Sequence, residues 1–316
     1  RDSIEDILDR METGRTRAEN LSGPTRGLMN YLNGSVAAIM NLNTRSASLQ
    51  LISTVNFINS SFNNPLQAAK ALANTKQYAK DFMFIMNSDM LKQRRQGLQI
   101  NVTEAEIASA ASSKNPAKAI MAKILKAGYI PTKFADSFAI ATGGATFYRN
   151  AIKKYMKEGM TEAEAQKKAF VDFQAIAERT QQSSRADLIS KQQTTLAGRF
   201  ILPFANTPMQ MNRIMMKNYL DIYKGRYKGF YGENSLTQKL SNIGYYGFLQ
   251  SVIFAGLQSA GFAIFANSDD DELKAKKKAT MIDGVSTSFL RGMGIQGAVL
   301  DGVVKAGQEF YKQREK

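Results

Sequence analysis

Two runs of charged residues near the C-terminus have types and spacing that could bind ions. The acidic run Asp269-Asp270-Asp271-Glu272 offers carboxylates that could hold a divalent cation. It lacks the alternating ligands and the turn glycine of a calcium loop, so we expect a solvated turn. The basic run that follows it could contact anionic lipid head groups or phosphate, or could simply be solvated. The members of the basic run are Lys274, Lys276, Lys277 and Lys278.

A glycine pair in the middle of the chain resembles part of a phosphate-binding loop. Gly143-Gly144 precedes Thr146 and Arg149. The pattern G-x-x-x-x-G-K-[ST] is not present, and no predicted strand comes before the glycines. We therefore expect a close helix–helix contact or a turn at this place, and no phosphate site.

Histidine and cysteine are both absent from the 316 residues. This excludes cysteine nucleophiles, histidine general bases and Ser-His-Asp triads. Zinc sites normally use one of these two residue types, and acid–base chemistry would have to use Asp, Glu, Lys or Tyr. The composition therefore predicts a protein that is not an enzyme and that holds no metal or cofactor.

The chain is strongly basic, with 42 Lys and Arg against 27 Asp and Glu, a net charge of +15. Such a charge favours association with nucleic acid, with an anionic membrane surface or with an acidic partner, although a basic solvated surface is an alternative. Any nucleic-acid binding is expected to be sequence-independent. The first residue is Arg1 and no secretory signal is present, so we interpret the sequence as a piece of a longer polypeptide.

Helices must position all of these residues, because no stretch shows strand alternation with hairpin turns. The sequence predicts an all-α fold, an irregular multi-helix assembly with a C-terminal apolar helical hairpin. Residues 1–20 should form a short amphipathic helix that needs a partner, and Asn63-Asn64-Pro65 should start a helix over residues 65–91. Thr161 and Glu164 have the spacing of a capping box that opens another helix.

Helix-breaking prolines and glycines along the chain predict three regions. Residues 1–130 form an N-terminal helical region, residues 131–230 a second helical region, and residues 231–316 the apolar hairpin. The first boundary is placed at Tyr129-Ile130-Pro131, and the second where Gly225, Gly229 and Gly232 interrupt the pattern.

The densest pattern lies between residues 180 and 217. A linker rich in hydroxyl and amide side chains leads into an apolar turn and then into Asn206-Thr207-Pro208. Thr207 as N-cap and Pro208 as first helical residue predict a helix start. We expect a fixed helix–turn–helix corner here in preference to a catalytic site.

This segment, from Gln182 through Gln210, resembles the helical C-terminal region of very large polyvalent proteins of tailed bacteriophages and related mobile elements. The residues that carry the resemblance are Arg185, Asp187, Gln193, Gly198, Arg199, Phe204, Asn206, Thr207, Pro208 and Gln210. The preceding run from Gly143 to Arg149 and the helix after Thr161 also fit, so the resemblance covers about the middle third of the chain. It implies a polypeptide that is packaged in the virion and delivered with the genome, and it supplies no catalytic residues. The Asn-rich composition is compatible with a crAss-like phage.

The last third contains an uncharged segment from Leu240 to Ser268, which is 29 residues long. A membrane-spanning helix needs about 20 residues, but polar residues and glycines make this a marginal span. At helical spacing, small and polar residues fall on one face, suited to close helix packing or to a wet lumen. They are Gly244, Gly247, Ser251, Ala255 and Gln258. A buried hairpin in a soluble or packaged assembly is the alternative to membrane insertion.

Three functions remain open from the sequence. The first is a cargo or ejection protein, carried in the tail or capsid and released into the host envelope or cytoplasm, where it contacts the membrane. The second is a purely structural component of the tail or portal. The third is a non-catalytic helical region of a large packaged RNA polymerase polyprotein. In each case the expected partners are other virion proteins, and the chain is expected to act in several copies.

Overall fold

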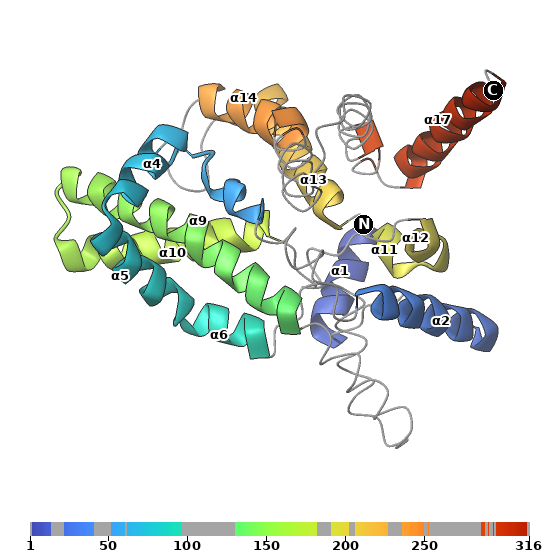
Figure 1. Cartoon of the computed structure of the whole chain (residues 1–316), viewed down its shortest axis with the longest axis horizontal. Coiled ribbons are helices and arrows are strands. Elements are labelled where there is room, and N and C mark those ends of the chain that lie inside the picture. Colours follow the sequence, from blue (N-terminus) through green and yellow to red (C-terminus); the bar gives the residue numbers. More distant parts are fainter. Residues whose placement is uncertain are drawn as a thin grey trace, which may run out of the picture. The chain divides into compact units, whose positions relative to one another are not determined.

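The computed structural model describes the chain in separate stretches. These are residues 2–13, 22–40, 52–60, 62–96, 130–181, 191–201, 206–226, 236–249 and 295–314, with residues 252, 286, 287, 290 and 293 (Figure 1). Within these stretches there is no β-strand, only an isolated bridge between Ser60 and Asn63. The prediction of an all-α protein is confirmed.

The chain divides into two compact units. The first contains Arg1–Thr16, Asn30–Ile189 and Tyr227–Gln238, and the second contains Arg17–Met29, Ser190–Arg226 and Lys239–Lys316. This division differs from the three consecutive regions predicted from the sequence. The predicted boundary at residue 130 falls inside the first unit, because the helix that begins there packs against helices that precede it in the chain.

The first unit is built around one long helix, α9 (Ile130–Lys157). The elements packed against α9 are η1 (Ile52–Phe57), α4 (Pro65–Ala73), α5 (Thr75–Met86), α6 (Asp89–Gln96) and α10 (Glu162–Thr180). Figure 1 shows α10 running beside α9, and α5 crossing it. The N-terminal α1 (Asp2–Thr13) belongs to the same unit, whereas α2 (Gly23–Met40) has residues in both.

Short polar motifs set where these helices begin and end. Asn64 and Gln67 form a reciprocal capping box before α4, and Thr161 and Glu164 form one before α10, as predicted. The single helix predicted over residues 65–91 is wrong, because α4, α5 and α6 replace it. Asn74 ends α4 and accepts the Gln77 backbone N–H, so the local side-chain hydrogen bond competes with helix continuation.

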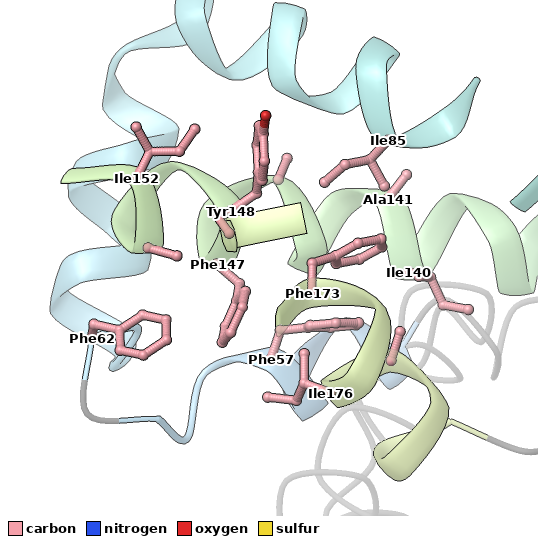
Figure 2. Close-up of a cluster of buried hydrophobic side chains, with 14 of the residues drawn as sticks. Phe57, Phe62, Ile85, Ile140, Ala141, Phe147, Tyr148, Ile152, Phe173 and Ile176 are labelled. Carbon is pink, nitrogen blue, oxygen red and sulfur yellow. The ribbon is translucent and has the colours of Figure 1, made fainter. Parts of the chain in front are cut away.

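The core of the first unit is apolar and rich in aromatic rings (Figure 2). Phe57 of η1 stacks on Phe173 of α10 with ring centroids 6.0 Å apart, and Phe62 packs on Phe147 of α9 at 4.9 Å. One face of α10 is buried in this core, and it consists of Ala165, Ala169, Phe173, Ile176 and Ala177. Burial of these side chains is the main source of stability of the unit.

The predicted close contact at Gly143-Gly144 is also confirmed. Both glycines lie inside α9, where a Cβ on Gly144 would stand 2.3 Å from the Phe173 ring. A Cβ on Gly143 would stand 2.6 Å from the backbone oxygen of Thr54. The two glycines therefore let α10 and η1 approach α9, and they are packing residues.

The second unit contains shorter helices. They are α11 (Lys191–Thr194), α12 (Leu196–Ile201), α13 (Asn206–Tyr223), most of α14 (Leu236–Gly244), the π-helical turn η2 (Tyr245–Leu249) and α17 (Ile295–Arg314). The residues of α14 up to Gln238 belong to the first unit. Within this unit α13 packs against η2, and α12 packs against α17. α17 lies in the region predicted to form the C-terminal hairpin, and most of the remainder of that region lies outside the described residues.

Candidate functional site

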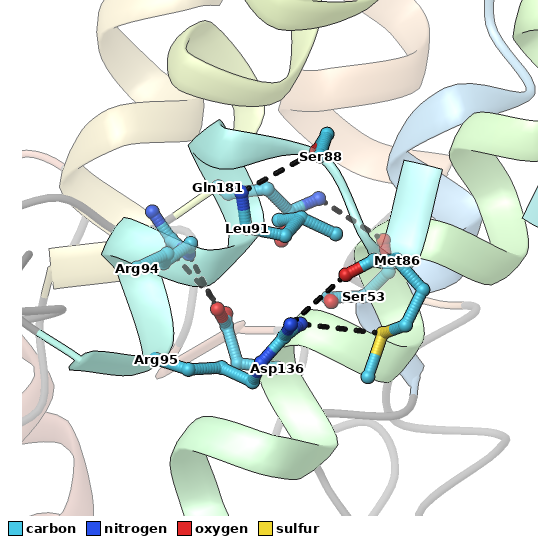
Figure 3. A network of polar contacts seen from close by, with 8 residues as sticks. All are labelled: Ser53, Met86, Ser88, Leu91, Arg94, Arg95, Asp136 and Gln181. Atoms are coloured by element: carbon cyan, nitrogen blue, oxygen red, sulfur yellow. Dashed lines mark hydrogen bonds and ion pairs between the residues drawn. The ribbon is translucent and has the colours of Figure 1, made fainter. Parts of the chain in front are cut away.

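Buried polar side chains of the first unit form three charged or phenolic contacts around α9. The first joins α6 to α9 (Figure 3): Arg94 donates from Nε to Oδ2 of Asp136 at 2.5 Å and from Nη2 to Oδ1 at 3.2 Å. Neighbouring Arg95 donates to the Met86 carbonyl oxygen at 2.9 Å, which satisfies an acceptor at the end of α5. Both arginines therefore fix the position of α6.

The second contact joins α5 to α9. Arg149 donates two hydrogen bonds to Asp81, with N–O distances of 2.7 and 2.6 Å, and Gln77 donates a third at 3.0 Å. The hydrogen bond from Arg149 to Asp81 raises the pKa of the guanidinium. Burial raises the pKa of adjacent Tyr148, and the charge of Asp81 adds to this. Asp81 therefore accepts hydrogen bonds from two neighbours, and the raised pKa of Tyr148 keeps its hydroxyl protonated.

The third contact joins α9 to α10. The Tyr155 hydroxyl donates to Asp172, and both residues are buried. The Lys168 ammonium lies 4.7 Å from the centre of the Tyr155 ring. In all three contacts the carboxylate is hydrogen-bonded to an arginine or a tyrosine of a neighbouring helix. The three contacts therefore join helices to one another.

A neutral network completes the polar interior. Buried Asn63 donates to the Phe57 carbonyl at 2.6 Å and to the Thr146 hydroxyl at 3.2 Å, and it accepts from Asn150 at 2.9 Å. Thr146 in turn donates to the Gly143 carbonyl. Thr146 and Arg149, the two polar residues that follow the glycine pair, are thus engaged in helix packing. Among the described residues, no three Asp or Glu side chains come together in a way that could hold a metal ion.

The predicted corner motif is only partly within the described residues. Arg185, Asp187 and Phe204 lie outside them, and nothing is described of the side chains of Gln193, Asn206 and Thr207. The backbone of Gln193 lies in α11, and Gly198 and Arg199 lie in α12.

The corner between α11 and α12 is tight. The Gly198 backbone N–H donates to the Thr195 hydroxyl, and that hydroxyl donates to the Gln192 carbonyl at 2.8 Å. A Cβ on Gly198 would stand 1.7 Å from the same carbonyl oxygen, so only glycine fits. Gly198 is therefore a packing residue of the corner between α11 and α12.

The helix that follows the corner starts two residues earlier than predicted. α13 begins at Asn206, so Thr207 is not the N-cap and Pro208 is the third helical residue. Proline is tolerated there because the N–H groups of a first turn have no partner within the helix. Gln210 is buried on the face of α13 that also carries Met211 and Ile214.

The predicted small-residue face is divided in the structure. Ser251, Ala255 and Gln258 lie outside the described residues. Gly247 lies in η2, where a Cβ would stand 2.5 Å from the Met215 sulfur of α13, whereas Gly244 has nothing within 4 Å of a Cβ. The π-helical turn changes the residue spacing after Gly244, so the predicted 100° periodicity does not hold through this segment.

Other predictions for the C-terminal third concern residues that the structure does not describe. Lys274, Lys276, Lys277, Lys278 and the acidic run before them lie outside. In the part of the chain that is described, no helix is both long enough and apolar enough to cross a bilayer.

An ion pair orders the interface of α13 and α14. The Lys239 ammonium donates to Asp221 at 3.1 Å, and Arg226 lies 2.8 Å from the same carboxylate. Burial alone would raise the pKa of Asp221, but the bond from Lys239 and the nearby positive charges outweigh it, and the pKa is lowered. One face of α13 is held in this way.

The opposite face of α13 is apolar and exposed. Met216, Leu220 and Tyr223 follow one another at spacings of four and three residues, and Tyr223 is 79% exposed. Lys217 and Lys224 follow Met216 and Tyr223 directly and are exposed as well. The result is an apolar stripe with a basic edge, which we call the α13 stripe.

Two further helices present apolar faces. Ile4, Leu8 and Met11 of α1 are exposed at spacings of four and three residues, and we call them the α1 stripe. On α17 one broad face is exposed and comprises Val299, Leu300, Val303, Val304, Phe310 and Tyr311. Exposed apolar faces on several helices are typical of proteins that bind other macromolecules. Each of these faces is, by itself, a candidate binding surface.

No protein-family model matches the chain, and neither the curated proteins nor the solved structures include a significant match. The function must therefore be inferred from the residues themselves. In the described part of the chain these combine polar pairs that join helices with apolar helix faces open to a partner.

Proposed function

We propose that the chain is a helical protein packaged in the virion of a tailed bacteriophage, delivered with the genome, and acting through binding rather than catalysis. The observation that carries the proposal is the pattern from Gln182 to Gln210, which resembles polyvalent phage proteins. The net charge of +15 supports it, because a basic protein can be stored beside packaged DNA.

The polar interior supports a binding role. Asp81, Asp136 and Asp172 each accept hydrogen bonds from a neighbouring helix. A carboxylate held in this way stabilises the fold, whereas a general base would need access to a substrate proton. The apolar faces of α1, α13 and α17 provide the surfaces through which such a protein can contact its partners.

The test uses intact particles of the phage or prophage that encodes the chain. Quantitative mass spectrometry should find peptides of the chain in purified full particles, in several copies per particle. Particles emptied by triggered ejection should have lost most of them. Retention in emptied particles would instead favour a structural component of the tail or portal, and absence from full particles would refute packaging.

The length of the mature polypeptide separates the remaining alternative. Peptide coverage should show whether the chain is carried on a much longer polypeptide with polymerase sequences. A mature product that contains only this chain and similar helical sequence would favour the cargo protein. A product that contains a polymerase would overturn an independent cargo role.

A further inference from the structure

The charge of α1 is opposite to that of the chain as a whole. Five of its twelve residues are acidic, namely Asp2, Glu5, Asp6, Asp9 and Glu12, and Arg10 is its one basic residue, which gives a net charge of −4 (five negative, one positive). This helix belongs to a protein of net charge +15. Arg10 is buried and forms an ion pair with Asp6, so that side of α1 faces the protein.

The α1 stripe lies on another side of the same helix. Ile4, Leu8 and Met11 are 64%, 57% and 55% exposed. Spacings of four and three residues place them in positions d, a and d of a heptad, the seam that packs against a second helix. Glu5 and Glu12 follow the two d residues and therefore occupy the e positions along one edge.

The α13 stripe has the same register with the opposite charge. Met216, Leu220 and Tyr223 occupy d, a and d, and Lys217 and Lys224 occupy the e positions. The backbone N–H of Lys224 donates to the Leu220 carbonyl at 3.0 Å, so the helical path continues through this lysine. Both seams span seven residue steps, about 10 Å along a helix.

We propose that the α1 stripe of one copy of the chain packs in antiparallel orientation on the α13 stripe of a second copy. In an antiparallel pair of helices the e positions face one another, so Glu5 and Glu12 would lie beside Lys224 and Lys217. The g positions also face one another, and these are Ile7 and the exposed Tyr219, both apolar. The apolar contacts between the two stripes and the charge pairs along their edges therefore favour the same antiparallel register.

A second copy accounts for both stripes, whereas an anionic membrane accounts for one. The lysine-edged α13 stripe suits an anionic bilayer, but the glutamates beside the α1 stripe would be repelled by it. The two stripes are different surfaces, so the contact is heterologous. Each added copy then leaves one stripe of each kind open, and the assembly grows into a ring or a filament.

The test measures the mass of the full-length protein against concentration by light scattering after size exclusion. The wild type should show species larger than the monomer that grow with concentration. Variant A carries Glu5→Lys and Glu12→Lys, and variant B carries Lys217→Glu and Lys224→Glu. Each variant alone should associate on the order of tenfold more weakly, which corresponds to about 1.4 kcal/mol.

Mixing the two variants gives the decisive result. Variant A keeps a native α13 stripe and variant B a native α1 stripe, and the two reversed stripes again carry opposite charges. An equimolar mixture should therefore recover the wild-type mass. A matched control for apolar contact compares Leu8→Gln, which should weaken association, with Leu66→Gln at an exposed position of α4, which should not. Far-ultraviolet circular dichroism of each variant verifies that the helices remain folded.

Three outcomes would overturn the proposal. One is a wild type that stays monomeric at every concentration, which is also the result expected if the stripes pair within one chain. Another is association that neither variant weakens, or that mixing does not restore. The third is binding of the wild type, lost in variant B, to phosphatidylserine vesicles without self-association, which would assign the α13 stripe to a membrane. Self-association does not depend on packaging, so a self-associating protein absent from particles would refute the proposed function alone.

Discussion

The guanidinium of Arg94 on α6 and the carboxylate of Asp136 on α9 face each other as a buried ion pair, joined by two hydrogen bonds. Their side chains are 2% and 1% exposed. Taking both charges out of water is costly, and the cost is offset only while both partners are present. The two residues are 42 positions apart in the sequence, and their pairing holds α6 and α9 in one relative position.

Asp136→Ala should lower the free energy of unfolding by about 3–5 kcal/mol, because it leaves the Arg94 charge buried and unpaired. The double variant Arg94→Met, Asp136→Leu should recover most of this loss. Urea unfolding followed by circular dichroism measures both. The control is Lys92→Ala, which breaks an exposed pair with Asp89 and should cost about 0–1 kcal/mol. A cost for Asp136→Ala as small as that of the control would contradict the structural role.

Gly144→Ala should destabilise the first unit by about 1–3 kcal/mol, because the new methyl group would meet the Phe173 ring inside a packed core. Gly302→Ala on α17 provides the matched control, since nothing lies within 4 Å of its Cβ position. Alanine there should leave stability unchanged or raise it by about 0.5–1 kcal/mol. Equal effects of the two substitutions on the unfolding midpoint would count against the close approach of α9 and α10.

The capping box of α10 predicts a dependence on acid. Hydrogen bonds from the Thr161 hydroxyl and backbone lower the pKa of Glu164 in the folded protein. A lowered pKa stabilises the fold above the unfolded-state pKa, and this stability is lost as pH falls through the folded-state value. Thr161→Ala should cost about 1 kcal/mol at neutral pH and less in acid.

Thermal unfolding between neutral pH and about pH 3, below the reference Glu pKa, tests this dependence. Glu164→Gln is the control, because glutamine keeps the capping geometry without a titrating group. In the Glu164→Gln background, the cost of Thr161→Ala should not change with pH. A Thr161→Ala cost that is the same at both ends of the range in the wild-type background would exclude a contribution from the Glu164 charge.

Nucleic-acid binding, if driven by the net charge of +15, should be independent of sequence and should weaken with salt. Fluorescence anisotropy with two unrelated duplexes at about 50 and 200 mM salt should show equal affinities that fall together by at least about tenfold. An affinity that is constant across this range, or a strong preference for one duplex, would contradict binding by charge alone.

Local patterns in the sequence determined the helical character of the protein and several helix starts. Asn64 before Pro65 and the Thr161–Glu164 pair act within one helical turn, so their effect can be read without knowledge of the fold. The amphipathic character of α1 and the apolar face of α10 follow from spacing alone. The absence of His and Cys limits the available chemistry through composition alone, because no arrangement of the helices can supply a missing imidazole or thiol.

Only the tertiary structure decided which polar residues meet. The contacts Arg94–Asp136, Arg149–Asp81 and Tyr155–Asp172 join residues on different helices, and no spacing in the sequence marks them. The π-helical turn at Tyr245–Leu249 likewise disrupted a face that uniform helical spacing had predicted. The amphipathic pattern of α1 was visible in the sequence, but whether its apolar side is buried or exposed depends on how the remaining helices pack, because burial is a property of the whole fold.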